Sequence, residues 1–274
     1  MRLEGPLQFP NINPVAVTMG PFSIRWYALA YLGGVALGAL YGRQLLARRS
    51  LWPGNSPPFE PSAIYDFAFW AVLGIVLGGR IGYVLFYNLP LYWAHPLDAF
   101  AIWDGGMSFH GGLVGILLAL VVFARSKGGG ILSAMDLLSA IVPIGLLLGR
   151  IANFINGELY GRETDLPWGV VFPGGGPLPR HPSQLYEGGL EGLVLFLALL
   201  LVIRTGGLKR PGLVAGLFGM GYAIARILVE FVRIPDVQLG YLAGGWLTMG
   251  QLLSVPVLLA GLIFVIRAVS RPQG

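Results

Sequence analysis

The stretch LLLGRIANFINGELYG, residues 146–161, ends an apolar run with an arginine, two asparagines and a glutamate. Apolar runs of about twenty residues recur along the chain, and a helix of that length crosses the roughly 30 Å hydrocarbon core of a bilayer. The chain has 274 residues, of which 55% are hydrophobic and 11% charged, whereas soluble domains are about a quarter charged. We therefore predict an all-α polytopic membrane protein in which Arg150 and its polar neighbours end a membrane-spanning helix.

The hydropathy pattern predicts seven spans in a single domain over residues 1–274. The spans lie near residues 22–46, 65–88, 109–125, 133–155, 186–204, 212–232 and 248–267. A glycine-rich tract at 94–112 is a candidate dipping loop, which other helices must shield because backbone groups in lipid have to be paired internally. A small loop region on the outer, periplasmic side is expected at about 156–185. The amino terminus lacks a secretory signal, so the first helix is read as a retained span.

Basic residues predict the orientation. Ten of the 18 lysines and arginines flank one set of loops, which we place in the cytoplasm together with the carboxyl terminus. The ten are Arg43, Arg48, Arg49, Arg125, Lys127, Arg204, Lys209, Arg210, Arg267 and Arg271. The amino terminus is then outside. The net charge of +5 suits an anionic inner leaflet, and nothing in it indicates nucleic-acid binding.

The remaining eight basic residues are all arginines. They are Arg2, Arg25, Arg80, Arg150, Arg162, Arg180, Arg226 and Arg233. A guanidinium binds phosphate or carboxylate through two parallel hydrogen bonds, so this group predicts an anion site toward the outer side. Arg80, Arg150 and Arg226 lie within or at the end of predicted spans, where ionisable groups normally face a bundle interior or a wet cavity.

Helical spacing gathers these charges on two helix faces. Spacings of four, four and three place Tyr222, Arg226, Glu230 and Arg233 on one face. Spacings of three and four do the same for Arg150, Asn153 and Gly157. The alternative is structural, namely buried ion pairs that hold helices together, such as Arg226 with Glu230.

Histidine and cysteine content limits the chemistry. The chain has no cysteine and three histidines without ligand spacing, which argues against a structural metal site. His110 is bracketed by glycine pairs and is a candidate proton acceptor for a thiol or hydroxyl nucleophile, although a lone histidine is more often structural. Ser183, followed by Glu187 and Glu191, is interpreted as a helix cap rather than a nucleophile.

Several stretches together resemble one enzyme family. Residues 149–161 read GRIANFINGELYG, which fits the pattern G-R-x-[G/A]-N-F-x-N-x-E-x-x-G at every fixed position. In chain order, SIRWYALAY, GGRIGYVLFYN, WDGGMSFHGGLVG, LPRHPSQLYEG, RILVEFVRIPD and MGQLLSVP are similar as well. The chain thus resembles the bacterial prolipoprotein diacylglyceryl transferases over essentially its whole length, with a fairly short outer segment at 162–179 as the departure.

The resemblance implies an enzyme of the bacterial cytoplasmic membrane whose active site faces the outer side. Such an enzyme transfers the diacylglyceryl group of phosphatidylglycerol to the lipobox cysteine of a prolipoprotein signal peptide. A thioether forms, and glycerol-1-phosphate leaves. Membrane lipids are further partners, and no metal or cofactor is required. The reactive cysteine belongs to the substrate.

The resemblance also implies roles for particular residues. Arg150 and Arg226 are expected to hold the phosphate, and His110 to activate or orient the thiol. Asn153 and Glu158 would position the glycerol head group or orient an arginine. The general base stays open between His110, a carboxylate and water. The further residues expected in substrate binding are Tyr27, Tyr222, Glu230, Arg233 and Arg80.

Two other classes of function stay open on the residues alone. A bundle whose arginines face a cavity also suits a transporter or flippase of an anionic lipid or metabolite, although the inverted repeats common in transporters are not found. A lipid-binding scaffold without catalysis is the third class. Chemistry separates them, because only a transferase leaves a thioether-linked lipid on a cysteine.

Overall fold

The computed structural model describes residues 6–10, 12–235 and 240–270, so Arg2 and Arg271 lie outside the described residues. The chain forms two compact units, each described by itself. Unit 1 comprises residues 1–41 and 136–274, and unit 2 comprises residues 42–135. The expectation of a single domain stays a prediction.

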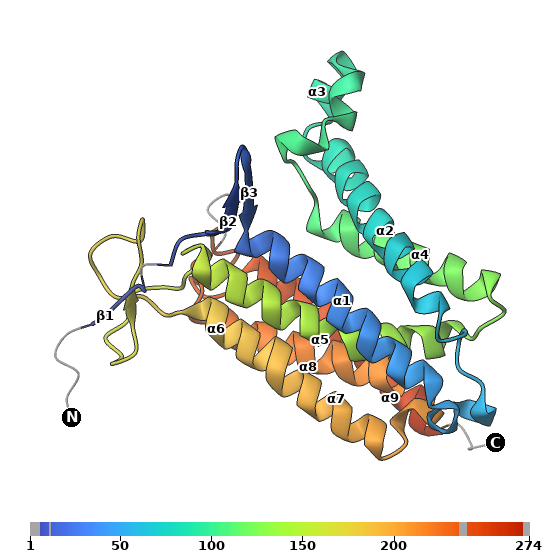
Figure 1. Ribbon diagram of the computed structural model, residues 1–274. Coiled ribbons are helices and arrows are strands. Elements are labelled where there is room, and N and C mark those ends of the chain that lie inside the picture. Colours follow the sequence, from blue (N-terminus) through green and yellow to red (C-terminus); the bar gives the residue numbers. More distant parts are fainter. Residues whose placement is uncertain (1–5, 11, 236–239, 271–274) are drawn as a thin grey trace. The chain divides into compact units, whose positions relative to one another are not determined.

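Unit 1 is built from long helices. In Figure 1 the continuous helix of α6, η5 and α7 runs beside α5, where Gly192 of η5 faces Leu147, and α8 packs against both α7 and α9. Helix α1 approaches α5 closely where Gly34 faces Gly145. The helices are α1 (Trp26–Ala47), α5 (Ile131–Ile155), α6 (Ser183–Glu187), the π-helical stretch η5 (Gly188–Val194), α7 (Leu195–Arg204), the short turn η6 (Gly207–Lys209), α8 (Leu213–Glu230) and α9 (Met249–Ser270).

Unit 2 centres on a tight helix pair. Helices α2 (Ala63–Phe86) and α4 (Phe109–Ser126) meet along glycines 74, 78 and 82 of α2 and glycines 111 and 115 of α4. Small residues at four-residue spacing let two backbones approach each other, as the sequence predicts. The remaining elements are η1 (Arg49–Leu51), η2 (Pro53–Asn55), α3 (Leu89–Ala94), η3 (Pro96–Phe100) and η4 (Ile102–Asp104).

The protein is a mostly helical polytopic membrane protein. Among the described residues, six helices are long and apolar enough to cross a membrane: α2, α4, α5, the continuous helix Ser183–Arg204, α8 and α9. Each matches a predicted span. The first predicted span corresponds to α1, which is not among the six, so the count of seven stays unconfirmed. Its predicted start is wrong, because residues 22–25 form a strand rather than helix.

Short strands and aromatic rings order the segment that precedes α1 and the loop that follows α5. Strand β2 (Val15–Met19) pairs antiparallel with β3 (Phe22–Arg25), and β1 (Leu7–Gln8) pairs parallel with β4 (Val170–Val171). Next to β1, the ring of Phe9 contacts Phe154 and Phe172 at centroid distances of 5.5 and 5.4 Å. Tyr160 stacks on Phe172 at 5.1 Å. The loop that follows α5, residues 156–182, is therefore packed against the last turn of α5.

A buried carboxylate joins α5 to the start of α8. Asp136 is fully buried, and its two carboxylate oxygens accept hydrogen bonds from the backbone N–H groups of Gly212 and Ala215 at 2.7 and 2.8 Å. The first N–H groups of a helix have no partner within the helix, and a carboxylate also favours the positive end of the helix dipole. Asp136 thus caps α8 from a different helix.

Replacing Asp136 by alanine is expected to lower stability by about 1–3 kcal/mol, because buried donors at the start of α8 lose their acceptor. Thermal unfolding of the detergent-solubilised protein measures the change. Asp66→Ala is the control, since Asp66 is exposed in the first turn of α2. Equal midpoints for Asp136→Ala and the wild type would contradict this role of Asp136.

Candidate functional site

The polar run that follows α5 folds back over the end of that helix. Gly157 has φ of +66°, which glycine adopts at little cost. The N–H of Glu158 bonds to the carbonyl of Asn153, and the N–H of Gly157 to that of Phe154, at 3.1 and 2.9 Å. This is the Schellman pattern that commonly ends helices. The Asn153 amide Nδ2 also donates to Glu158 Oε1 at 2.8 Å, so the carboxylate of Glu158 is fixed above the last turn.

Three arginines and three glutamates meet next to this turn. We call them the charge cluster: Arg150, Glu187, Glu191, Arg226, Glu230 and Arg233. They come from α5, α6, η5, α8 and the residues just after α8. The sequence predicts that Arg150, Arg226, Glu230 and Arg233 lie together, and the structure brings these four into one place.

Glu187 is the centre of the cluster. Its side chain is 0% exposed, and its carboxylate contacts all three arginines. Nη1 of Arg150 lies 2.8 Å from Oε2, while Nη1 of Arg226 and Nη1 of Arg233 lie 3.2 and 2.6 Å from Oε1. Arg226 also pairs with Glu230 at 2.6 Å, one helical turn further along α8. One carboxylate therefore fixes guanidinium groups that come from different segments.

The arginines keep part of their surface accessible while the carboxylates do not. The side chains of Arg150, Arg226 and Arg233 are 20, 17 and 12% exposed, against 0–5% for the three glutamates. The carboxylates therefore lie deeper than the guanidinium groups they hold. Buried ion pairs that hold the helices together, the structural alternative to an anion site, are thus present. These ion pairs do not use all the hydrogen-bond donors of the arginines, because each guanidinium carries five N–H donors.

Two tyrosines lie beside the cluster. Tyr27, at the start of α1, interacts electrostatically with Glu158 and Arg150, and its hydroxyl is 3.1 Å from that of Tyr31. Tyr222 of α8 interacts with the charges of Arg226 and Glu191. The structure thus adds both predicted tyrosines to the same region of unit 1.

The loop 156–182 holds the segment that carries Arg233. Gly161 packs so closely against the Val232 carbonyl that a Cβ atom would overlap it. Arg162 donates from Nε to the Arg233 carbonyl at 2.7 Å. His181 also belongs to this loop. Partial burial and the charge of Arg162 lower the pKa of His181.

Two predicted site residues, Arg80 and His110, lie in unit 2. Arg80 is buried and donates to the backbone carbonyls of Asp98, Ala99, Gly105 and Gly106. It thereby organises the loop that leads into α4. Its assignment to substrate binding stays a prediction.

His110 is exposed in the first turn of α4, whose N-cap is Ser108. Its ring contacts that of Phe109 edge to face at 5.6 Å. Its role in thiol activation also stays a prediction.

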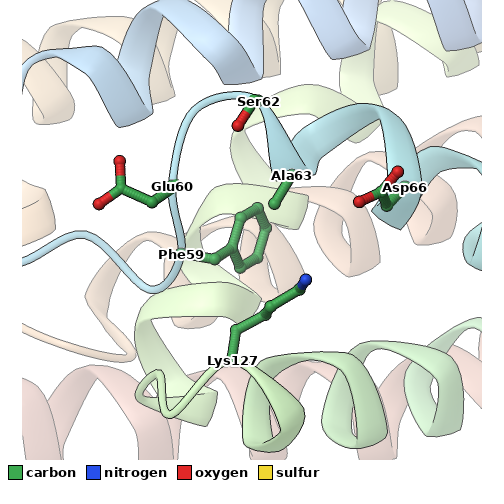
Figure 2. A pocket seen from close by; sticks show the side chains of 6 residues that line it. All are labelled: Phe59, Glu60, Ser62, Ala63, Asp66 and Lys127. Atoms are coloured by element: carbon green, nitrogen blue, oxygen red, sulfur yellow. The ribbon is translucent and has the colours of Figure 1, made fainter.

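Unit 2 also contains a pocket of about 420 Å³. In Figure 2 the pocket is bordered by Lys127 on one side and by Asp66 of α2 on another, and the ring of Phe59 lies between Lys127 and Ala63. None of the predicted site residues lines it. The residues that do are Phe59, Glu60, Ser62, Ala63, Asp66 and Lys127.

Sequence reasoning missed two of the three glutamates of the cluster. The sequence indicates only a helix start at Glu187 and Glu191, yet both are fully buried. The cap itself is also wrong, because Pro182 occupies the N-cap position and Ser183 is the first helical residue. The signal was available, since two glutamates four residues apart in an apolar span carry the same insertion cost as the arginines.

The fold and the site together define an integral membrane protein with a charged, partly accessible site between its helices. Residues 14–267 match the family described as prolipoprotein diacylglyceryl transferase. The chain is 57% identical over 263 residues to the phosphatidylglycerol–prolipoprotein diacylglyceryl transferase of Brucella anthropi, covering 96% of this chain and 94% of that protein. It is 56% identical to the proteins of that name from Rhizobium leguminosarum bv. trifolii and Agrobacterium fabrum, with the same coverage. The chain belongs to the prolipoprotein diacylglyceryl transferase family.

Proposed function

We propose that this protein transfers the diacylglyceryl group of phosphatidylglycerol to the lipobox cysteine of prolipoproteins, the first step of lipoprotein maturation. The observation that carries the proposal is the pair Arg150 and Arg226, held by the same Glu187 with part of each guanidinium still accessible. Two guanidinium groups that are already oriented can each bind a phosphodiester head group through parallel hydrogen bonds. Family membership supports the same activity, and both units act as one transferase domain.

The reaction is a displacement at an sp3 carbon. The cysteine thiolate attacks the glyceryl carbon that bears the phosphate, a C–S bond forms, and the C–O bond to phosphate breaks. Glycerol-1-phosphate leaves with the negative charge that grows on the ester oxygen, while the thiol proton passes to a base. Preorganised donors aimed at such a charge commonly supply the largest part of catalysis, and this is the role of Arg150 and Arg226.

The other site residues position the lipid and the arginines. Asn153 and Glu158 contact the glycerol head group, and Glu230 and Arg233 complete the charge network behind it. Tyr27 and Tyr222 border the lipid. Arg80 contributes to substrate binding indirectly, because it holds the loop that leads into α4. The protein lies in the cytoplasmic membrane with its amino terminus and active site outside and its carboxyl terminus inside. The distribution of lysines and arginines supports this orientation.

Mass spectrometry tests the function. Purified protein in detergent is incubated with phosphatidylglycerol and a synthetic lipobox peptide that has one cysteine, with the cysteine-to-serine peptide as control. We expect a diacylglyceryl mass on the cysteine peptide alone, with release of glycerol phosphate. Lipid binding without any mass gain would favour the transporter and would recast the arginines as a recognition site.

Replacing His110 by asparagine tests the thiol-activating role. We expect a loss of about 10²–10⁴-fold, as is typical when a general base is removed, and a loss that shrinks as the pH rises toward the pKa of the thiol. The pH profile of peptide modification measures this, and His95→Asn, in the loop after α3, is the control. Full activity of His110→Asn would exclude histidine as the base.

A further inference from the structure

Leu159, next to Glu158, has a backbone conformation that leucine avoids. Its φ is +57°, a region in which the Cβ atom of an L-residue approaches the following carbonyl oxygen. Among the described residues, only Asn55 shares a positive φ without being glycine, and asparagine tolerates this region better than other residues. Such a conformation persists only where the surroundings hold it, and it is concentrated at functional sites.

Two buried side chains at the start of α6 hold this conformation. The Ser183 hydroxyl donates to the carbonyl of Leu159 at 2.9 Å, and the Gln184 amide Nε2 donates to the carbonyl of Glu158. These carbonyls belong to the peptide groups on either side of Leu159, so fixing both of them fixes φ and ψ of that residue. Ser183 and Gln184 are each 0% exposed.

The same short helix carries the centre of the charge cluster. Glu187 ends α6, one turn after Ser183. Because Ser183 and Gln184 face the turn while Glu187 faces the arginines, α6 sets the turn and the guanidinium groups relative to each other.

We propose that Ser183 and Gln184 are positioning residues that hold Leu159 in its left-handed conformation and thereby aim the carboxylate of Glu158. The contact of Glu158 with the lipid head group rests on the proposed function, whereas the hold on Leu159 does not. Neither residue touches the reacting atoms. Their effect passes through the peptide groups that precede and follow Leu159.

A double-mutant cycle with Leu159→Gly tests the proposal. Glycine adopts positive φ about as readily as negative φ, so it removes most of the need for the two donors. We expect Ser183→Ala or Gln184→Met to lower kcat/KM about tenfold when Leu159 is present. In the Leu159→Gly background, we expect each to cost no more than about threefold.

Two matched controls accompany the cycle. Ser254→Ala removes another buried serine that donates to a backbone carbonyl, that of Gly250 at 2.7 Å, and is expected to leave kcat/KM within twofold. Leu166→Gly changes another half-exposed leucine of the outer loop, one without a positive φ, and should not reduce the cost of Ser183→Ala. Thermal unfolding of every variant identifies losses that come from unfolding.

Hydrogen exchange of residues 157–161 decides the positioning role independently of catalysis. We expect faster exchange of the Glu158 amide in Ser183→Ala and Gln184→Met, and restored protection when Leu159→Gly is added. Equal fold-losses in both backgrounds together with unchanged exchange would overturn the inference. If the wild type shows no transfer, the proposed function fails, while exchange still decides whether the two donors hold Leu159.

Discussion

Replacing Glu187 by glutamine is expected to abolish nearly all diacylglyceryl transfer, a loss of at least about 100-fold. The substitution removes one negative charge from the centre of three arginines whose nearest contacts to it are 2.6–3.2 Å. Removing one partner of a buried ion pair typically costs about 3–5 kcal/mol, because the remaining charge is left uncompensated. The guanidinium groups would then change orientation, and the phosphate would lose the two aligned guanidinium groups of Arg150 and Arg226.

Peptide modification measured by mass spectrometry, together with thermal unfolding, measures this change. Glu163→Gln is the matched control, because Glu163 also pairs with an arginine, Arg180 at 3.1 Å, but is 55% exposed. Exposed pairs contribute roughly 0–1 kcal/mol, so we expect activity within twofold of the wild type. If Glu187→Gln retained wild-type turnover, the shared carboxylate would not be what orients the arginines.

Replacing Arg150 or Arg226 by lysine is expected to lower kcat by about 10²–10³-fold, as is found when one preorganised donor to a developing anion is lost. Lysine keeps the positive charge but loses the planar fork. The Glu187 and Glu230 carboxylates retain a cation to pair with, so stability should change much less than activity. Steady-state kinetics with phosphatidylglycerol as the varied substrate separates kcat from KM.

Arg204→Lys is the control for this pair, because Arg204 is an exposed arginine in the last turn of α7. Near-normal turnover of Arg150→Lys or Arg226→Lys would refute the phosphate-binding role of the arginine concerned. A rise in KM alone would restrict that arginine to ground-state binding.

The long helices could be predicted from sequence because lipid imposes both their length and their apolar composition. Helices α2, α4, α5, α8 and α9 lie where the hydropathy pattern places them. The strand at residues 22–25 could not be predicted in this way. Its apolar residues continue directly into those of α1, and only pairing with β2 distinguishes them.

The arginines of the site and Glu230 were predictable, whereas Glu187 and Glu191 were not recognised. Arg150, Arg226 and Arg233 are conspicuous because the predicted orientation puts them on the outer side, against the usual charge bias. Glu187 and Glu191 follow a serine and a proline, a pattern that is also typical of a helix start. The left-handed Leu159 gives no signal in sequence, because its conformation comes from donors 24 and 26 residues away from the carbonyls they bind.

The equal numbers of acidic and basic groups in the charge cluster have a consequence for biogenesis. Glu187 and Glu191 lie on one helix of a hairpin, Arg226 and Glu230 lie on the next, and Arg150 arrives on α5. The helix Ser183–Arg204, entering the bilayer alone, would carry two unpaired carboxylates, and α5 would carry Arg150 apart from its partner carboxylates, at roughly 2.5–3.5 kcal/mol per residue. Arg226 and Glu230 already pair with each other along α8. Entry of α6, α7 and α8 as one hairpin beside α5 lets Glu187 and Glu191 pair with these arginines and so lowers that cost. The chain is therefore suited to leave the translocon as a paired group of helices rather than one span at a time.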